Sequence, residues 1–188
     1  WGTTGAVVAD LPVSQVGRVA FADGEGGVFI GGVDYRFEAE GDIFIQHLDS
    51  YGNLILEENG IALAKVAGRQ ITINMCTDSL GGVFVTWQDK RGGINDDIYG
   101  THVSADHEIV APGSGVAIVA EGGNQNAKSV EYAGNNQAFI AWVDYREGEN
   151  ANIYGQRLDL SMNGLFQENG IPIANTTNQE TKTRVTFM

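Results

Sequence analysis

The sequence repeats itself every 55 residues without an insertion or deletion. Asp34, Asp89 and Asp144 follow this period, and each one opens an Asp-x-Arg triplet. The same step relates three further sets of residues: Ile43, Ile98 and Ile153; Gly5, Gly60, Gly115 and Gly170; and Gln15, Gln70 and Gln125, with Glu180 in the fourth place. A fixed period of this length is typical of a repeat architecture, and it constrains the fold more strongly than any local propensity does.

Within the unit from Gln70 to Asn124, four short segments read as strands. Residues 71–77 largely alternate apolar and polar side chains, and residues 83–87 are rich in β-branched and aromatic ones. Residues 97–103 and 116–119 complete the set. Four short strands joined by hairpin-length loops predict an all-β fold in which each unit is one blade of a β-propeller. A β-solenoid is the alternative, although its rungs are usually shorter than this unit.

The repeated strings resemble those of a known family. Residues 139–146 (Phe-Ile-Ala-Trp-Val-Asp-Tyr-Arg) and 152–159 (Asn-Ile-Tyr-Gly-Gln-Arg-Leu-Asp) are similar to the Trp-x-Asp-x-Arg…Asp-Ile-Tyr-x-Gln repeats of large secreted and surface-anchored bacterial propeller proteins. TolB-type and WD40-like propeller repeats are more distantly similar. The resemblance covers essentially the whole chain, and it implies a propeller fold and an extracellular or cell-surface location. Gly32 departs from the pattern by replacing the Trp, so we expect the first gap between blades to lack an indole.

The repeat phase divides the chain into one propeller segment with incomplete ends. We expect a partial blade at residues 1–14, units at about 15–69, 70–124 and 125–179, and a partial blade at 180–188. Three blades and two partial ones form an arc with exposed edges and apolar blade faces, which invite pairing with further strands. We therefore expect the remaining blades to come from the rest of a longer chain, or from an oligomer that completes itself.

The composition excludes some partners. The formal net charge is −13, so the surface should repel nucleic acid and anionic membranes and attract cations such as calcium. No apolar run approaches the length of a membrane span, so we expect no membrane insertion. Cys76 is the single cysteine and lies outside the repeat, which favours a small buried side chain over a nucleophile.

The Asp-x-Arg triplets are predicted to hold each unit together as a structural repeat clamp, because the guanidinium group of Arg can brace several acceptors at once. A substrate-binding Arg cluster, as in sialidases, is the alternative, but the sialidase Asp-box pattern is absent. The clamp residues are Asp34, Arg36, Asp89, Arg91, Asp144 and Arg146.

The loops that follow these triplets are acidic and rich in Gly or Asn. Clustered oxygen ligands suit calcium, which takes six to eight of them. We therefore consider calcium a possible ligand, with solvated turns as the alternative. The candidate ligands are Glu38, Glu40, Asp42, Asp96, Asp97, Glu147 and Glu149.

The three histidines show no zinc-binding spacing. His47 and His102 share one phase of the repeat, and Arg157 occupies it in the third unit. A position that accepts His, His and Arg indicates a strand residue that faces solvent.

Residues that break the repeat are the better candidates for a specific site, because the innermost strands line the channel of a propeller. These possible binding residues are Arg18, Lys128, Glu131 and Arg184. No catalytic residues can be assigned. The close equivalence of the units favours a non-catalytic binding or scaffold domain that contacts protein or glycan through its loop rims or faces. The alternative is the propeller portion of a secreted hydrolase or lyase that acts on polysaccharide or peptide.

Overall fold

A computed structural model describes residues 3, 5–37 and 39–174, apart from the side chains of residues 17, 18 and 128. These residues form three four-stranded antiparallel sheets, each built from four consecutive strands. The prediction of an all-β fold is confirmed. The strands of the first sheet are β1 (Gln15–Ala22), β2 (Val28–Asp34), β3 (Asp42–Leu48) and β4 (Ile61–Ala64). Those of the second are β5 (Gln70–Thr77), β6 (Val83–Asp89), β7 (Asp97–Val103) and β8 (Val116–Val119). Those of the third are β9 (Gln125–Tyr132), β10 (Ala138–Asp144), β11 (Asn152–Leu158) and β12 (Ile171–Ala174).

The repeat in the sequence is a repeat in strand register. In all three sheets the second and third strands pair over seven residues, and this pairing ends at Asp34↔Asp42, Asp89↔Asp97 and Asp144↔Asn152. The first strand of each sheet carries a bulge. The units are therefore equivalent down to single residue pairs.

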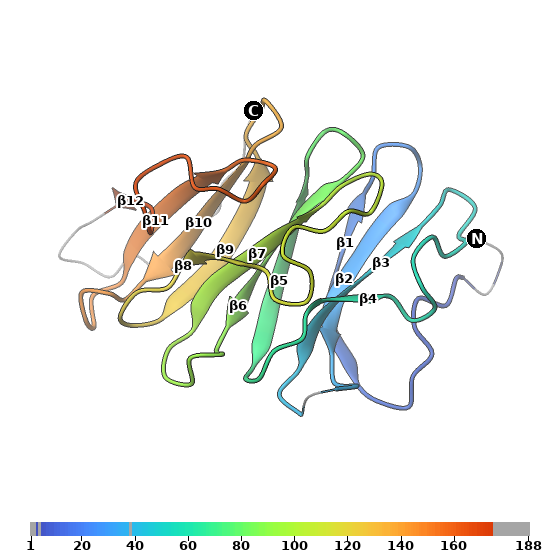
Figure 1. The fold of residues 1–188 in the computed structure, drawn as a ribbon, viewed down its shortest axis with the longest axis horizontal. Helices are drawn as coiled ribbons and strands as arrows, with labels where there is room; N and C mark the ends of the chain where they lie inside the picture. Colours follow the sequence, from blue (N-terminus) through green and yellow to red (C-terminus); the bar gives the residue numbers. More distant parts are fainter. Residues whose placement is uncertain (1–2, 4, 38, 175–188) are drawn as a thin grey trace.

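The sheets follow one another along the long axis of the molecule (Figure 1). The first strands of the second and third sheets, β5 and β9, each lie against the preceding sheet. Strand β5 contacts β1, β2 and β3 of the first sheet, and β9 contacts β5, β6 and β7 of the second. One backbone hydrogen bond recurs at both junctions, since Gln70 N donates to Gly41 O (3.2 Å) and Gln125 N donates to Asp96 O (2.6 Å). Each unit therefore docks on the preceding one through its first strand.

The core lies between the sheets rather than inside a single one. The repeated aromatic residues Phe29, Phe84, Trp87 and Trp142 are fully buried there. Strand β3 is buried along its whole length, because the rest of the molecule covers both of its faces. No helix in the described part of the chain is long and apolar enough to cross a membrane.

Candidate functional site: the repeated polar box and its vacant copy

Each sheet holds the Asp and Arg of its triplet in one polar box. In the second sheet, Arg91 Nη2 lies 2.6 Å from Asp89 Oδ2 and also donates to Ser114 O at 2.7 Å. The guanidinium carbon stacks 3.8 Å from the centre of the Tyr99 ring. Asp89 is fully buried, so the Arg both neutralises a buried charge and ties the end of β6 to the loop before β8.

The other two sheets repeat these contacts. Arg36 and Arg146 each lie 2.6 Å from their carboxylates and donate to the carbonyls of Asn59 and Asn169. Burial alone would lower the pKa of Arg146, but the hydrogen bond and charge of its carboxylate outweigh it and raise that pKa. The side chains meet because the chain turns directly after the strand: the strand ends at the Asp, and its Oδ1 accepts the backbone N–H of the Arg. That these contacts clamp the fold stays a prediction.

An indole completes the box in the second and third sheets. Trp87 Nε1 donates to Asp89 Oδ2 at 2.9 Å, and Trp142 Nε1 donates to Asp144 Oδ2 at 2.7 Å. Each indole lies against a glycine, because a Cβ built at Gly115 would come within 2.4 Å of the Trp87 ring. A side chain there would displace the ring, so these glycines are part of the box.

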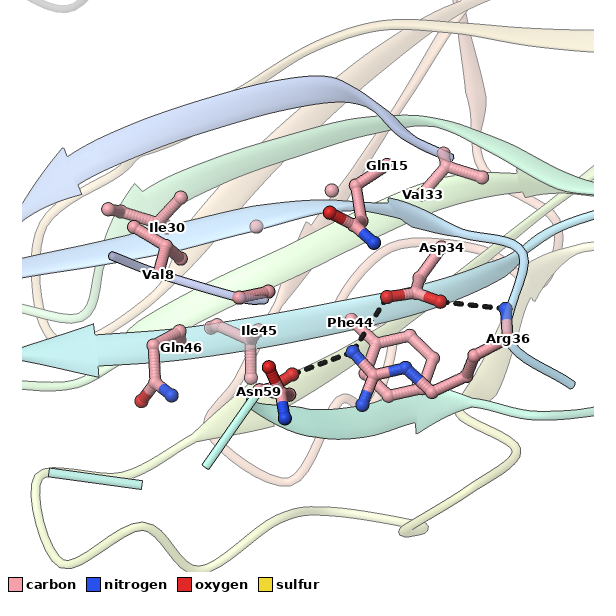
Figure 2. Close-up of a pocket in the computed structure, with 13 residues that line it drawn as sticks. Val8, Gln15, Ile30, Val33, Asp34, Arg36, Phe44, Ile45, Gln46 and Asn59 are labelled. Carbon is pink, nitrogen blue, oxygen red and sulfur yellow. Dashed lines mark hydrogen bonds and ion pairs between the residues drawn. The ribbon is translucent and has the colours of Figure 1, made fainter. Parts of the chain in front are cut away.

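The first sheet has the same box without the indole. Gly32 stands in place of the Trp, and a partly open cavity of about 40 Å³ lies at this position. Figure 2 shows Asp34, Arg36 and Asn59 joined by hydrogen bonds at one end of the cavity, with Val8 and Ile30 at the other. Apolar and polar groups converge here, as they do in binding pockets. The lining residues are Val8, Ala9, Gln15, Ile30, Gly31, Gly32, Val33, Asp34, Arg36, Phe44, Ile45, Gln46 and Asn59.

The expectation that His47 and His102 face solvent is wrong. Both side chains are buried, and their Nε2 atoms lie 3.0 and 2.8 Å from Oδ2 of Asp23 and Asp78. The same two carboxylates accept backbone N–H groups in the hairpin after the first strand. The histidines are buried because their face of the sheet packs towards the following unit. In the third unit Arg157 instead donates to a backbone carbonyl.

His107 joins the first of these pairs across the junction between sheets. Its Nε2 lies 2.9 Å from Nδ1 of His47, whose other nitrogen contacts Asp23. Burial lowers the pKa of His107, and the charge of His47 lowers it further, against a smaller opposite effect of Asp106. Burial would raise the pKa of Asp23, but hydrogen bonds from His47 and two backbone N–H groups lower it. No sequence pattern predicts this chain of contacts, because His107 lies in a loop and outside the repeat phase of the other two.

The candidate calcium ligands do not gather into a site. Within the described ranges, no group of three or more His, Cys, Asp or Glu side chains could hold a metal ion. Asp96 instead pairs with Arg69 at 3.0 Å, and Glu147 accepts a hydrogen bond from Asn152. Glu40, Glu147 and Glu149 are exposed, Asp42 is buried, Asp97 is half-buried, and Glu38 lies outside the described residues. Calcium binding by these loops stays a prediction.

Of the four possible binding residues, the structure describes the side chain of Glu131 only. It is half-buried on β9, and its charge is one cause of the raised pKa of Cys76, after burial. The side chains of Arg18 and Lys128, and the whole of Arg184, fall outside the described part of the chain. Their role stays a prediction.

No family model and no curated protein matches the sequence. Among solved structures, the chain is similar to that of an α-L-arabinanase from Penicillium chrysogenum in complex with arabinobiose, with a TM-score of 0.44 and 12% sequence identity. The match covers 79% of this chain and 48% of the arabinanase chain, so this chain spans about half the length of that enzyme. Neither the fold class nor the function proposed below rests on this likeness.

Proposed function

We propose that the three sheets are blades of a β-propeller, and that the chain is a non-catalytic binding or scaffold segment of a secreted or cell-surface bacterial protein. The observation that carries this proposal is the use of the repeated polar residues inside each unit. The triplets and the Asp–His pairs bond to the sheets and turns that hold them. Because these repeated charges are bonded inside the units, we expect the loops and the faces of the sheets to contact a ligand.

The loops at both ends of the sheets carry exposed apolar side chains. Tyr51 is 81% exposed between β3 and β4, and Ile94 is 82% exposed between β6 and β7. Leu54, Ile55 and Leu165 are further exposed apolar side chains in the loops before the fourth strands. Exposed aromatic and aliphatic side chains at a polar rim are typical of surfaces that bind protein or glycan. The net charge of −13 disfavours nucleic acid as the partner.

A secreted hydrolase or lyase is the second candidate, and one observation favours it. His107, which has Met162 as its counterpart one period later, extends the first Asp–His pair into a chain of contacts from Asp23 through His47 to His107. This chain has the carboxylate–imidazole order of a proton-transfer relay. Catalysis needs such asymmetry at one site.

A panel of soluble polysaccharides and extracellular proteins separates the two candidates. The binding function predicts a complex in calorimetry or affinity electrophoresis, no release of reducing ends or peptides, and weaker binding after Tyr51→Ala. Product release that is lost in His107→Met would support the enzyme instead. An absence of both binding and turnover across the panel would contradict both.

A further inference from the structure

Two of the three polar boxes are filled by an indole of the protein itself, and they show which ring shape a box accepts. In the second and third sheets the indole N–H points at the Asp carboxylate, at 2.9 and 2.7 Å. The far edge of each ring lies where a Cβ at Gly115 or Gly170 would come within 2.4 or 2.3 Å of it. A carboxylate at one end and a glycine at the other thus define an indole-shaped space.

The first sheet keeps the walls of this box. Asp34 is 2% exposed and holds its Arg partner at 2.6 Å, and Phe44 stands under that guanidinium group as Tyr99 does in the next unit. Gly60 occupies the place of Gly115 in the repeat. A Cβ built at Gly60 would meet the carbonyl of Ile45 rather than an aromatic ring. The indole is missing, because Gly32 has no side chain to supply it, and Val8 and Ala9 stand where the next unit has Leu63 and Ala64.

We propose that the cavity at Gly32 is a binding site for the indole ring of a ligand, which donates its N–H to Asp34. The chemistry of the walls matches this ring. Val8, Ile30 and Phe44 offer apolar surface to its faces, and the buried carboxylate offers the acceptor that Trp87 and Trp142 use in their own boxes. The ring comes either from a small heterocycle or from a tryptophan side chain of a peptide. All of these walls belong to the described residues. The inference rests on these walls alone, so it does not depend on the proposed function.

The cavity is too small for an indole ring, so one of its walls has to move when the ring binds. A cavity of about 150 Å³ takes up benzene in a protein core, whereas this one holds about 40 Å³. The wall that can yield is the segment with Val8 and Ala9, which are half-buried and lie outside any strand. Their counterparts in the next unit, Leu63 and Ala64, are fully buried in β4. Binding therefore displaces this segment, and we expect a dissociation constant on the order of 1 mM for indole alone.

Isothermal titration of the 188-residue protein with indole tests the proposal. Benzothiophene has the same shape without the N–H, so it should bind about tenfold more weakly, as expected when a hydrogen bond to a charged acceptor is lost. Gly32→Trp fills the site with the protein's own indole and should abolish binding. N-acetyltryptophanamide tells the two sources apart: its binding indicates a tryptophan side chain, and binding of indole alone indicates a small heterocycle.

Methyl NMR of the unaltered protein keeps the proposal testable if Gly32→Trp does not fold. Indole should shift the methyl signals of Val8, Ala9 and Ile30, and leave those of Val119, in the second sheet, unchanged. No binding up to the solubility limit of indole would overturn the proposal. Equal binding to Gly32→Trp, or shifts spread over the whole molecule, would overturn it as well.

Discussion

The Arg of the second polar box offers the sharpest test of what holds a unit together. Replacing Arg91 by Met keeps an unbranched apolar side chain over the ring of Tyr99 and removes the guanidinium group. The change leaves Asp89 buried without its ion-pair partner and leaves Ser114 O without its donor. Any loss of stability therefore reports on these polar contacts rather than on packing.

The magnitude follows from the burial of the pair. Removing one partner of a buried ion pair costs about 3–5 kcal/mol. The Arg91 side chain is 22% exposed, and Asp89 keeps three donors: the indole of Trp87, the backbone N–H of residue 91 and, at 3.5 Å, the side-chain amide of Gln70. We therefore expect a loss of about 2–4 kcal/mol, somewhat below the full range. For a chain of this size each kcal/mol lowers Tm by about 2–4 °C, so the expected fall is about 4–16 °C.

Urea unfolding followed by circular dichroism measures this loss. Lys90→Met serves as the matched control, because it removes the same charge one residue away from the box. The free energy of unfolding of the control should stay within about 0.5 kcal/mol of the original protein, as for most surface changes. If Arg91→Met cost no more than Lys90→Met, the triplet would not be a clamp.

Two further predictions concern pH. Burial and then the charge of His47 lower the pKa of His107, so the unfolded chain binds the proton more tightly and Tm should fall as the pH drops below about 6.5. His107→Met, which installs the residue found at Met162 one period later, should flatten the profile of Tm between pH 7 and 5; an unchanged slope would contradict the assignment. Burial and then two nearby carboxylates raise the pKa of Asp97, so its charge destabilises the fold at neutral pH. Asp97→Asn, which copies Asn152 of the third unit, should raise Tm at pH 7, with a gain that shrinks as the pH approaches 4; a gain that grows on acidification would show that the sign is wrong.

The period of the sequence predicted the strands well, because repetition averages out the ambiguity of any single segment. The four strands expected in the second unit are β5 to β8, with small differences at their ends. The vacancy at Gly32 was also visible in advance, since two other units show what is missing. The repeat thus located both the strands and the position of the missing indole.

The orientation of side chains was harder to predict from the repeat. The positions of His47 and His102 looked polar and therefore exposed, but both faces of their strands are covered. The carboxylates that contact these histidines lie 24 residues earlier in the chain, and no local sequence pattern connects the two positions. The acidic loops pose the same difficulty, because a count of carboxylates says nothing about whether they converge. Contacts between segments that are distant in the sequence therefore required the structure.

The central claim is that the sheets fan out around an axis as propeller blades do. Pulsed electron paramagnetic resonance on doubly spin-labelled protein tests it directly, since the native Cys76 is buried. One pair of labels replaces Glu25 and Asn135, at equivalent exposed sites in the hairpins beside the first strands, and the other replaces Asn53 and Asn163, in the loops before the fourth strands. A propeller predicts a clearly longer distance for the pair near the fourth strands. Equal distances would indicate a straight stack of sheets and would contradict the account.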